Sequence, residues 1–132
     1  MRRPSLPVLI VLAVVVPGAI AVPALSASRK TVNVKIGESP RFYFVKPTPA
    51  VPAVTIRAGD RIRWQWCPDT GGCSAEHNVV GTRDGKVKFK HPRNASDSVG
   101  QTTGSYAKTF ATRGSYRVEC TIHDFAMKVK VR

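Results

Sequence analysis

The sequence is short of methionine, cysteine and acidic residues. Of its 132 residues, two are Met, three are Cys and eight are Asp or Glu. It also lacks a convincing amphipathic helical segment, which argues against a helical fold. A chain of this length forms one domain with a single modest core. Little chain is left to build a substrate cleft, so we do not expect an enzyme.

The N-terminal segment has the composition of a secretory signal peptide. It begins with Met1-Arg2-Arg3, continues with an apolar run over 6–16 and ends in small residues. We predict a signal peptide over 1–27 and a mature domain over 28–132, with cleavage after Ala21, Ala24 or Ala27. A retained membrane anchor is the alternative, because the apolar stretch approaches the length of a bilayer span, although three prolines interrupt it. The segment has no cysteine, which argues against a lipid-anchored lipoprotein.

The positive charge remains after removal of the leader. The whole chain carries +13, and without Arg2 and Arg3 there are 19 basic and 8 acidic residues, for a net charge of +11. Such a field attracts acidic protein partners and anionic membrane or wall surfaces. An exported chain rarely meets nucleic acid, so we expect no nucleic-acid partner. We expect a monomer in the periplasm, at the cell surface or secreted.

Three cysteines cannot all pair within one exported chain. Cys67 and Cys73 flank a turn-rich segment, 68–72, that can fold back on itself, so they are the natural disulfide pair. Closing this short loop contributes about 2 kcal/mol in the chain-entropy model. Cys120 is left over and is available for another purpose.

Short segments of alternating polarity follow the leader, separated by Gly, Pro and Asp turns. In the segment 61–66, for example, Ile62, Trp64 and Trp66 share one face, and we expect both tryptophans in the core. This pattern is typical of an all-β Greek-key β-sandwich of about seven or eight strands. The expected strands cover 31–36, 41–45, 54–56, 61–66, 77–80, 106–110, 115–120 and 127–132, with a brief strand at 87–89 inside a polar region over 81–104.

Four side chains with metal-ligating chemistry gather around the last two expected strands. Cys120 shares the inward face of its strand with Tyr116 and Val118. His123 and Met127 follow in the expected loop, and His77 comes from a distant strand. A thiolate, two imidazoles and a thioether are the ligand set of a blue-copper site. Met127 as a core-filling residue remains an alternative.

The sequence resembles the small type-1 copper proteins of the plastocyanin, pseudoazurin, amicyanin and halocyanin group, the cupredoxins. The matching segments are 58–64, 77–80 and 114–120, the last continuing to the following His and Met. The resemblance implies one copper ion held by His77, Cys120, His123 and Met127. Here Met127 follows Cys120 by seven positions, whereas the commoner family loops are one residue shorter or longer.

The resemblance also implies roles for the neighbours of these ligands. Asn78 would tie the first ligand strand to the cysteine loop and hydrogen-bond around the thiolate sulfur. His123 would be the ligand nearest to solvent and the electron port. Phe125 and Ala126 are candidates for the apolar patch that docks partners.

Three functions fit these observations. The favoured prediction is an exported electron carrier, with copper delivery and a copper-free interaction module as alternatives. A zinc site fits less well because a thioether favours copper. A catalytic Cys–His pair lacks a third group to orient the histidine. His91 is expected to be a surface histidine outside the site.

Overall fold

The computed structural model of the chain describes residues 28–37, 42–44 and 53–132. The predicted signal peptide and its cleavage positions lie outside the described residues. The described part contains nine strands and no helix, which confirms the all-β prediction. Accordingly, it has no helix with the length and apolar character needed to cross a bilayer. The strands are β1 (Thr31–Ile36), β2 (Phe42–Phe44), β3 (Ala53–Ile56), β4 (Arg61–Trp66), β5 (Val79–Arg83), β6 (Lys86–His91), β7 (Ser105–Thr109), β8 (Gly114–Cys120) and β9 (Phe125–Val131).

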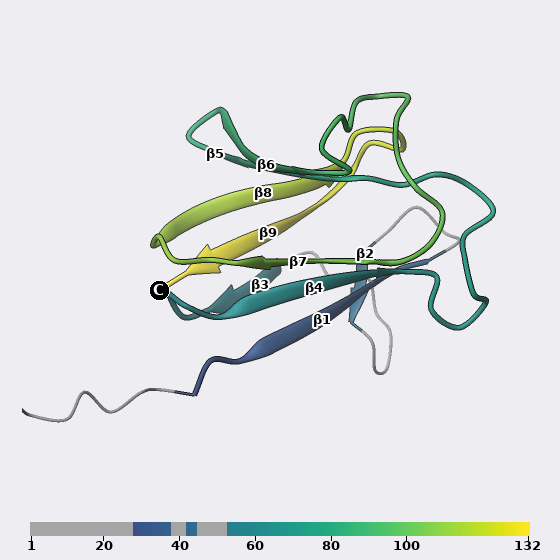
Figure 1. Cartoon of the computed structure of the whole chain (residues 1–132). Coiled ribbons are helices and arrows are strands. Elements are labelled where there is room, and N and C mark those ends of the chain that lie inside the picture. The colour runs from purple at the N-terminus through teal and green to yellow at the C-terminus, as the bar shows by residue number, and fades with distance from the viewer. Residues whose placement is uncertain (1–27, 38–41, 45–52) are drawn as a thin grey trace, which may run out of the picture.

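The strands form the two sheets of a β-sandwich (Figure 1). The four-stranded sheet has the order β2-β1-β4-β7, and the five-stranded sheet has the order β3-β9-β8-β5-β6. Two of the pairings, β1 with β4 and β3 with β9, are parallel, and the others are antiparallel. Strands that are neighbours in the sequence therefore often belong to different sheets, as in a Greek key.

Alternation of side chains along the strands builds the core between the sheets. In β4 the buried residues are Ile62, Trp64 and Trp66, and the intervening residues face outward. Both tryptophans are core residues as predicted, at 0% and 2% exposure. Burying each large apolar side chain contributes about 1.5–3 kcal/mol. This core fixes the relative positions of β4, β5 and β8, which lead to the site.

The region 81–104 contains more strand than the sequence suggested. The brief strand expected at 87–89 is the six-residue β6, and β5 runs over Val79–Arg83 and not over 77–80. Gly81 explains the difference. It looks like a turn residue, but a Cβ at this position would lie 2.1 Å from the Phe89 ring, so the glycine makes room for that ring within the sheet.

A tight turn joins β8 to β9. Cys120 pairs in register with Phe125, so only 121–124 lie between the strands. Asp124 adopts a positive φ of 50°, a conformation that Asp tolerates better than most residues. Because β9 begins two residues earlier than expected, Met127 lies inside this strand, opposite Val118. Met127 was expected where the loop meets the first residue of the last strand, and it lies instead at the third residue of that strand.

Candidate metal centre

Cys120 and His123 come from the β8–β9 connection. Cys120 is the last residue of β8 and is 0% exposed, because its side chain lies on the inward face with Tyr116 and Val118. It is the only free cysteine among the described residues. His123 lies three residues later in the turn and is half-buried. One short turn thus brings a buried thiol and a more exposed imidazole to the same end of the sandwich.

His77 is held from a separate part of the chain. Its backbone forms an isolated bridge with Gln101, in which each amide donates to the other residue's carbonyl, at 3.0 and 2.9 Å. The Trp66 indole N–H also donates to the His77 carbonyl at 2.9 Å. The His77 side chain is 1% exposed. Its position is therefore fixed by backbone contacts on both sides, independently of any metal.

The three side chains converge on one point. The Cys120 Sγ lies 3.9 Å from His77 Nδ1 and 3.8 Å from His123 Nδ1. Ligand atoms of the three residues all lie within 4.8 Å of one another, and they form the one such group found among the described His, Cys and acidic residues. With bonds of about 2.3 Å to sulfur and about 2.0 Å to nitrogen, as for Zn²⁺, trigonal ligands lie about 3.7 Å apart. The separations therefore suit a single metal ion bound by all three.

Phe125 covers the histidine rings. Its ring meets His77 edge-on, with centroids 5.9 Å apart, and lies nearly parallel to His123 at 6.4 Å. The two imidazole centroids are 4.6 Å apart. Both Phe125 and Ala126 are half-buried. The end of the molecule beside His123 therefore has an apolar surface with limited access for water.

Asn78 connects the segment that holds His77 to the segment that holds Cys120. Its side-chain oxygen accepts the Thr121 amide N–H at 2.9 Å. Its side-chain nitrogen donates to Ser96 O, Val99 O and Thr121 Oγ1, at 2.8, 3.0 and 3.0 Å. The side chain is fully buried. These contacts place Asn78 where the resemblance implied a bond between the first ligand segment and the cysteine loop.

Gly100 is a further residue at the site that sequence reasoning missed. A Cβ there would lie 2.7 Å from the His77 carbonyl oxygen and 2.7 Å from the Ile122 side chain. The Gly100 amide donates to the Glu76 carboxylate at 3.2 Å. The only sequence signal is a glycine in a polar loop, which reads as a turn and gives no hint of contact with His77.

Met127 is 1% exposed and belongs to the core cluster that contains Cys120. It shares the inward face of β9 with Phe125 and Val129. In a strand, every second residue lies about 7 Å further along, so Met127 is one step deeper than Phe125. The structure thus places it below the three-residue cluster, and the axial role implied by the resemblance stays a prediction.

His91 is not the surface histidine that its polar neighbours suggested. Its ring stacks on Tyr106 with centroids 4.5 Å apart and an interplanar angle of 12°, and it contacts Trp66 at 5.6 Å. Burial lowers the pKa of His91, and a side-chain hydrogen bond with Gln101 partly offsets this. It lies outside the three-residue cluster, as expected.

The structure joins Cys67 and Cys73 in a disulfide, with an S–S distance of 2.05 Å. The Cys73 amide donates to Thr102 O at 2.7 Å, so the disulfide loop is tied to the segment that continues to Gln101 and His77. The disulfide loop therefore lies beside the site and restrains the segment that leads to Gln101 and His77.

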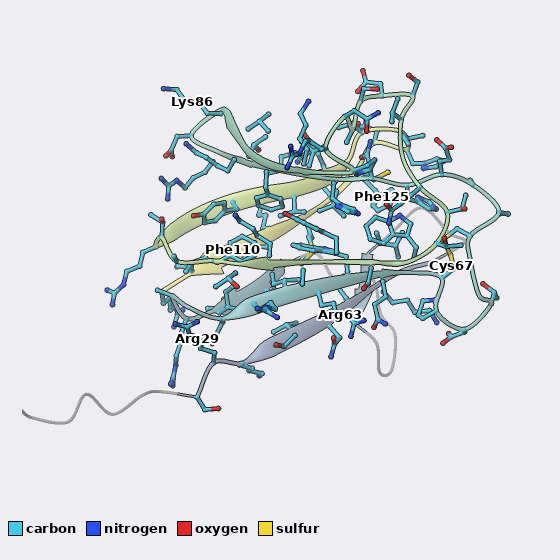
Figure 2. All side chains as sticks on the ribbon, in the orientation of Figure 1. Arg29, Arg63, Cys67, Lys86, Phe110 and Phe125 are labelled. Carbon is cyan, nitrogen blue, oxygen red and sulfur yellow. A yellow bond between two sulfur atoms is a disulfide. The ribbon has the colours of Figure 1, made fainter. Side chains whose placement is uncertain are left out.

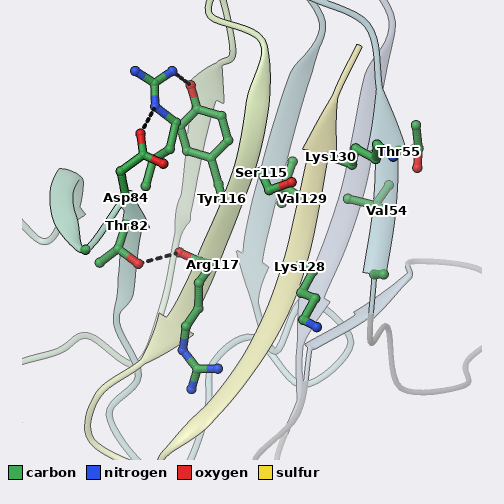
Figure 3. Close-up of a pocket in the computed structure, with 13 residues that line it drawn as sticks. Val54, Thr55, Thr82, Asp84, Ser115, Tyr116, Arg117, Lys128, Val129 and Lys130 are labelled. Carbon is green, nitrogen blue, oxygen red and sulfur yellow. Dashed lines mark hydrogen bonds and ion pairs between the residues drawn. The ribbon is translucent and has the colours of Figure 1, made fainter.

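A groove of about 590 Å³ lies elsewhere, on the outer face of the five-stranded sheet (Figure 3). Within it, Arg83 donates to the Tyr116 hydroxyl at 3.2 Å and forms an ion pair with Asp84 at 3.4 Å. None of the predicted ligands lines this groove, whose residues are 53–55, 82–85, 115–117 and 128–130. The groove and the histidine–cysteine cluster are separate features.

Residues 44–132 match the sequence family described as copper binding proteins, plastocyanin/azurin family. The chain belongs to this family. Its cofactor is copper, and the donor set of one thiolate and two imidazoles agrees with that metal. No curated protein matches the chain.

Solved cupredoxin structures share the fold. A purple cupredoxin from Nitrosopumilus maritimus superposes with a TM-score of 0.51 at 19% identity, covering 76% of this chain and 99% of that one. A mutant fern plastocyanin gives a TM-score of 0.51 at 18% identity, with the same coverage. An amicyanin variant in the Cu(I) form gives 0.48 at 20% identity, covering 83% of this chain and 87% of that chain. At these identities the first two likenesses establish the β-sandwich fold alone.

Proposed function

We propose that this cupredoxin is an exported carrier of single electrons between redox proteins. One copper ion is bound by His77, Cys120 and His123, with Met127 as the axial ligand. The observation that carries the proposal is the convergence of one thiol and two imidazoles, within 4.8 Å, in a family of copper-binding proteins. The predicted leader and the disulfide support export, because disulfides persist in oxidising compartments.

The protein contributes a fixed set of donors. Copper supplies the one-electron couple, whose potential depends on the axial ligand and on the surroundings of the sulfur. Trp66 and Gln101 fix the His77 backbone, and Asn78 fixes Thr121 beside the thiolate. Donors held in this way would offer copper the same arrangement in both oxidation states, so little reorganisation would accompany each transfer.

Electrons pass through the His123 end of the site in this proposal. His123 is half-buried, whereas His77 and Cys120 are 1% and 0% exposed, so His123 is the ligand nearest to a docked partner. Phe125 and Ala126 provide apolar contact area around it, which suits brief association. Such a carrier has no catalytic residues and needs no substrate cleft.

The partners remain proposals as well. We propose redox proteins as partners, a monomeric state and no nucleic acid. The acidic character of the redox partner, predicted from the net charge of +11, stays a prediction.

Copper delivery without a redox partner is the alternative. A delivery site exchanges its metal readily, and therefore keeps its ligands accessible. The burial of His77 and Cys120 favours retention of the metal, and so favours the carrier. Transfer of copper to an apo acceptor at a rate comparable to electron exchange would favour delivery.

The test is addition of Cu(II) to the apo protein. A type-1 site gives intense visible absorption from thiolate-to-copper charge transfer, and the carrier also shows a reversible one-electron potential. Cys120→Ser removes the donor sulfur and abolishes the absorption, whereas His91→Gln, outside the cluster, retains it. A colourless wild-type protein would overturn the proposal.

A further inference from the structure

Basic side chains gather at one end of the sandwich, while other charged side chains of the described chain, such as Lys35, Arg117 and Lys130, lie along the strands. The end opposite the metal centre, called here the basic end, comprises the start of β1, the β3–β4, β5–β6 and β7–β8 turns and the C-terminal residue. Its basic side chains are Arg29, Lys30, Arg57, Arg61, Arg83, Lys86, Arg113 and Arg132.

Backbone contacts bring these segments together. The Arg61 amide donates to Lys30 O at 2.8 Å, and the Ala58 amide donates to Arg132 O at 2.9 Å. The Arg83 guanidinium lies 3.4 Å from Arg113 O. Figure 2 shows Arg29 and Lys86 at the same side of the molecule, with Phe125 and Cys67 at the other. The basic end is therefore one continuous surface built from both sheets.

Few acidic residues offset this charge. The basic end contains Asp60, which is buried, and Asp84, which is paired with Arg83. Its side chains therefore carry a net charge of +6, from eight basic and two acidic residues. Seven of the eight basic side chains are exposed, and Arg83 is half-buried.

The described loops around the metal centre contain more acidic than basic residues. Segments 67–78, 92–104 and 121–124 contain Asp69, Glu76, Asp97 and Asp124 but only Arg93 as a cation. The seven-residue strand β8 runs from one end to the other and spans about 20 Å. This exceeds the Debye length of about 8 Å at physiological ionic strength, so each end presents its own field to a partner.

We propose that the basic end binds an anionic lipid bilayer and holds the His123 end away from the membrane. Basic residues are attracted to anionic headgroups within a Debye length of the surface, and this end gathers eight of them. A bilayer is favoured over a folded protein because the exposed cations extend over turns from both sheets. The chain upstream of Ser28 is joined to this end, two residues before Lys30.

The orientation has a consequence for electron transfer. With the basic end on the membrane, His123 and Phe125 face a soluble partner. The charge that attracts the protein to the membrane lies about 20 Å from the surface that docks the redox partner. The cations of the basic end therefore do not set the sign of charge that this docking surface prefers.

Vesicle binding by the copper-free full-length chain tests the proposal. Binding to phosphatidylglycerol vesicles is compared between two variants that lose the same charge. The basic-end variant carries Arg57→Gln, Arg61→Gln, Lys86→Gln and Arg113→Gln, and the control carries Arg63→Gln, Lys90→Gln, Arg93→Gln and Lys128→Gln. All eight side chains are exposed. The leader is common to both variants, and phosphatidylcholine vesicles measure its contribution.

We expect the basic-end variant to lose vesicle binding on the order of 600-fold, since each of its four removed basic residues contributes about fivefold at the surface. The control is expected to lose about threefold, because its cations lie outside the contact. Equal losses in the two variants would show attraction by net charge alone and would overturn the proposal. Wild-type binding to a soluble anionic polymer but not to vesicles would overturn the choice of a lipid partner.

Amine acetylation of the wild-type protein gives a second readout that needs no variant to fold. On the vesicle, Lys30 and Lys86 are protected, whereas Lys90 and Lys128 react as in solution. Protection of the second pair without the first would overturn the orientation. Because both measurements use copper-free protein, failure here is distinguishable from failure of the electron-carrier proposal.

Discussion

Asn78 and Thr121 are hydrogen-bonded through both backbone and side chain. The Thr121 amide donates to Asn78 Oδ1 at 2.9 Å, and Asn78 Nδ2 lies 3.0 Å from Thr121 Oγ1. These contacts join the residue after His77 to the residue after Cys120. The two ligand segments are 43 positions apart in the chain, and Asn78 sets their separation.

Asn78→Ala tests this relationship. It leaves the part-buried Thr121 amide without its protein partner and removes one of the two donors to the Ser96 and Val99 carbonyls, so we expect a loss of about 1–3 kcal/mol in the free energy of unfolding, measured in urea. The charge-transfer absorption of the copper form should shift as well. The matched control, Thr121→Val, removes only the hydroxyl and costs about 1 kcal/mol. Equal losses for the two variants would contradict the role given to the amide.

Gly100→Ala should disturb the site through the His77 backbone. The added methyl group would lie 2.7 Å from the His77 carbonyl oxygen, so the loop or the histidine must move. We expect a destabilisation of about 1–3 kcal/mol, typical of overpacking, and an altered copper spectrum. Ser98→Ala, at an exposed position of the same loop, should change neither quantity. An unaltered spectrum in Gly100→Ala would show that the loop moves to accommodate the methyl group and that His77 keeps its position.

Met127→Leu separates an axial role from a packing role. The substitution keeps the volume of the side chain, so stability should fall by less than about 1.5 kcal/mol. If the thioether is the axial ligand, as we expect, the absorption and the reduction potential both change. Met127→Ala should cost about 2–5 kcal/mol in either case, because the side chain is buried. A spectrum and potential unchanged in Met127→Leu would assign Met127 to the core alone.

Asp60 should make stability depend on pH at the basic end. Hydrogen bonds from the backbone amides of Arg57 and Lys30, at 2.9 Å each, hold the pKa of Asp60 below its ordinary value of 3.8. The folded state therefore favours the carboxylate, and this stabilisation is complete above pH 3.8 and is lost as pH falls through the folded pKa.

The corresponding variant is Asp60→Asn. Urea unfolding at pH 7 should show a lower stability than the wild type, and the difference should shrink as the pH falls below 3.8. Asp84→Asn is the control, since that carboxylate is exposed. A difference between Asp60→Asn and the wild type that stays constant with pH would show that the charge of Asp60 does not contribute.

Alternation along the strands predicted the fold well because it records which face of a strand is buried. It correctly placed Trp64, Trp66 and Cys120 in the core. It does not record contacts made by loops or between strands of the two sheets, and this is why the contact of Gly100 with His77 and the stacking of His91 on Tyr106 were missed. The start of β9 was also misjudged, because Phe125 and Ala126 fit a turn and a strand equally well. Met127, expected as the first residue of the last strand, is therefore the third residue of β9.

The order of the three cysteines along the chain has a consequence for biosynthesis. If the chain is exported from its N-terminus, as proposed, Cys67 and Cys73 emerge first, separated by only six positions. Cys120 would follow 47 positions after Cys73, and Cys67 and Cys73 could already be oxidised to each other by then. The single remaining thiol is then enclosed by β9, the last strand to emerge. In an exported chain, this order would keep the Cys120 sulfur from mispairing before any metal arrives.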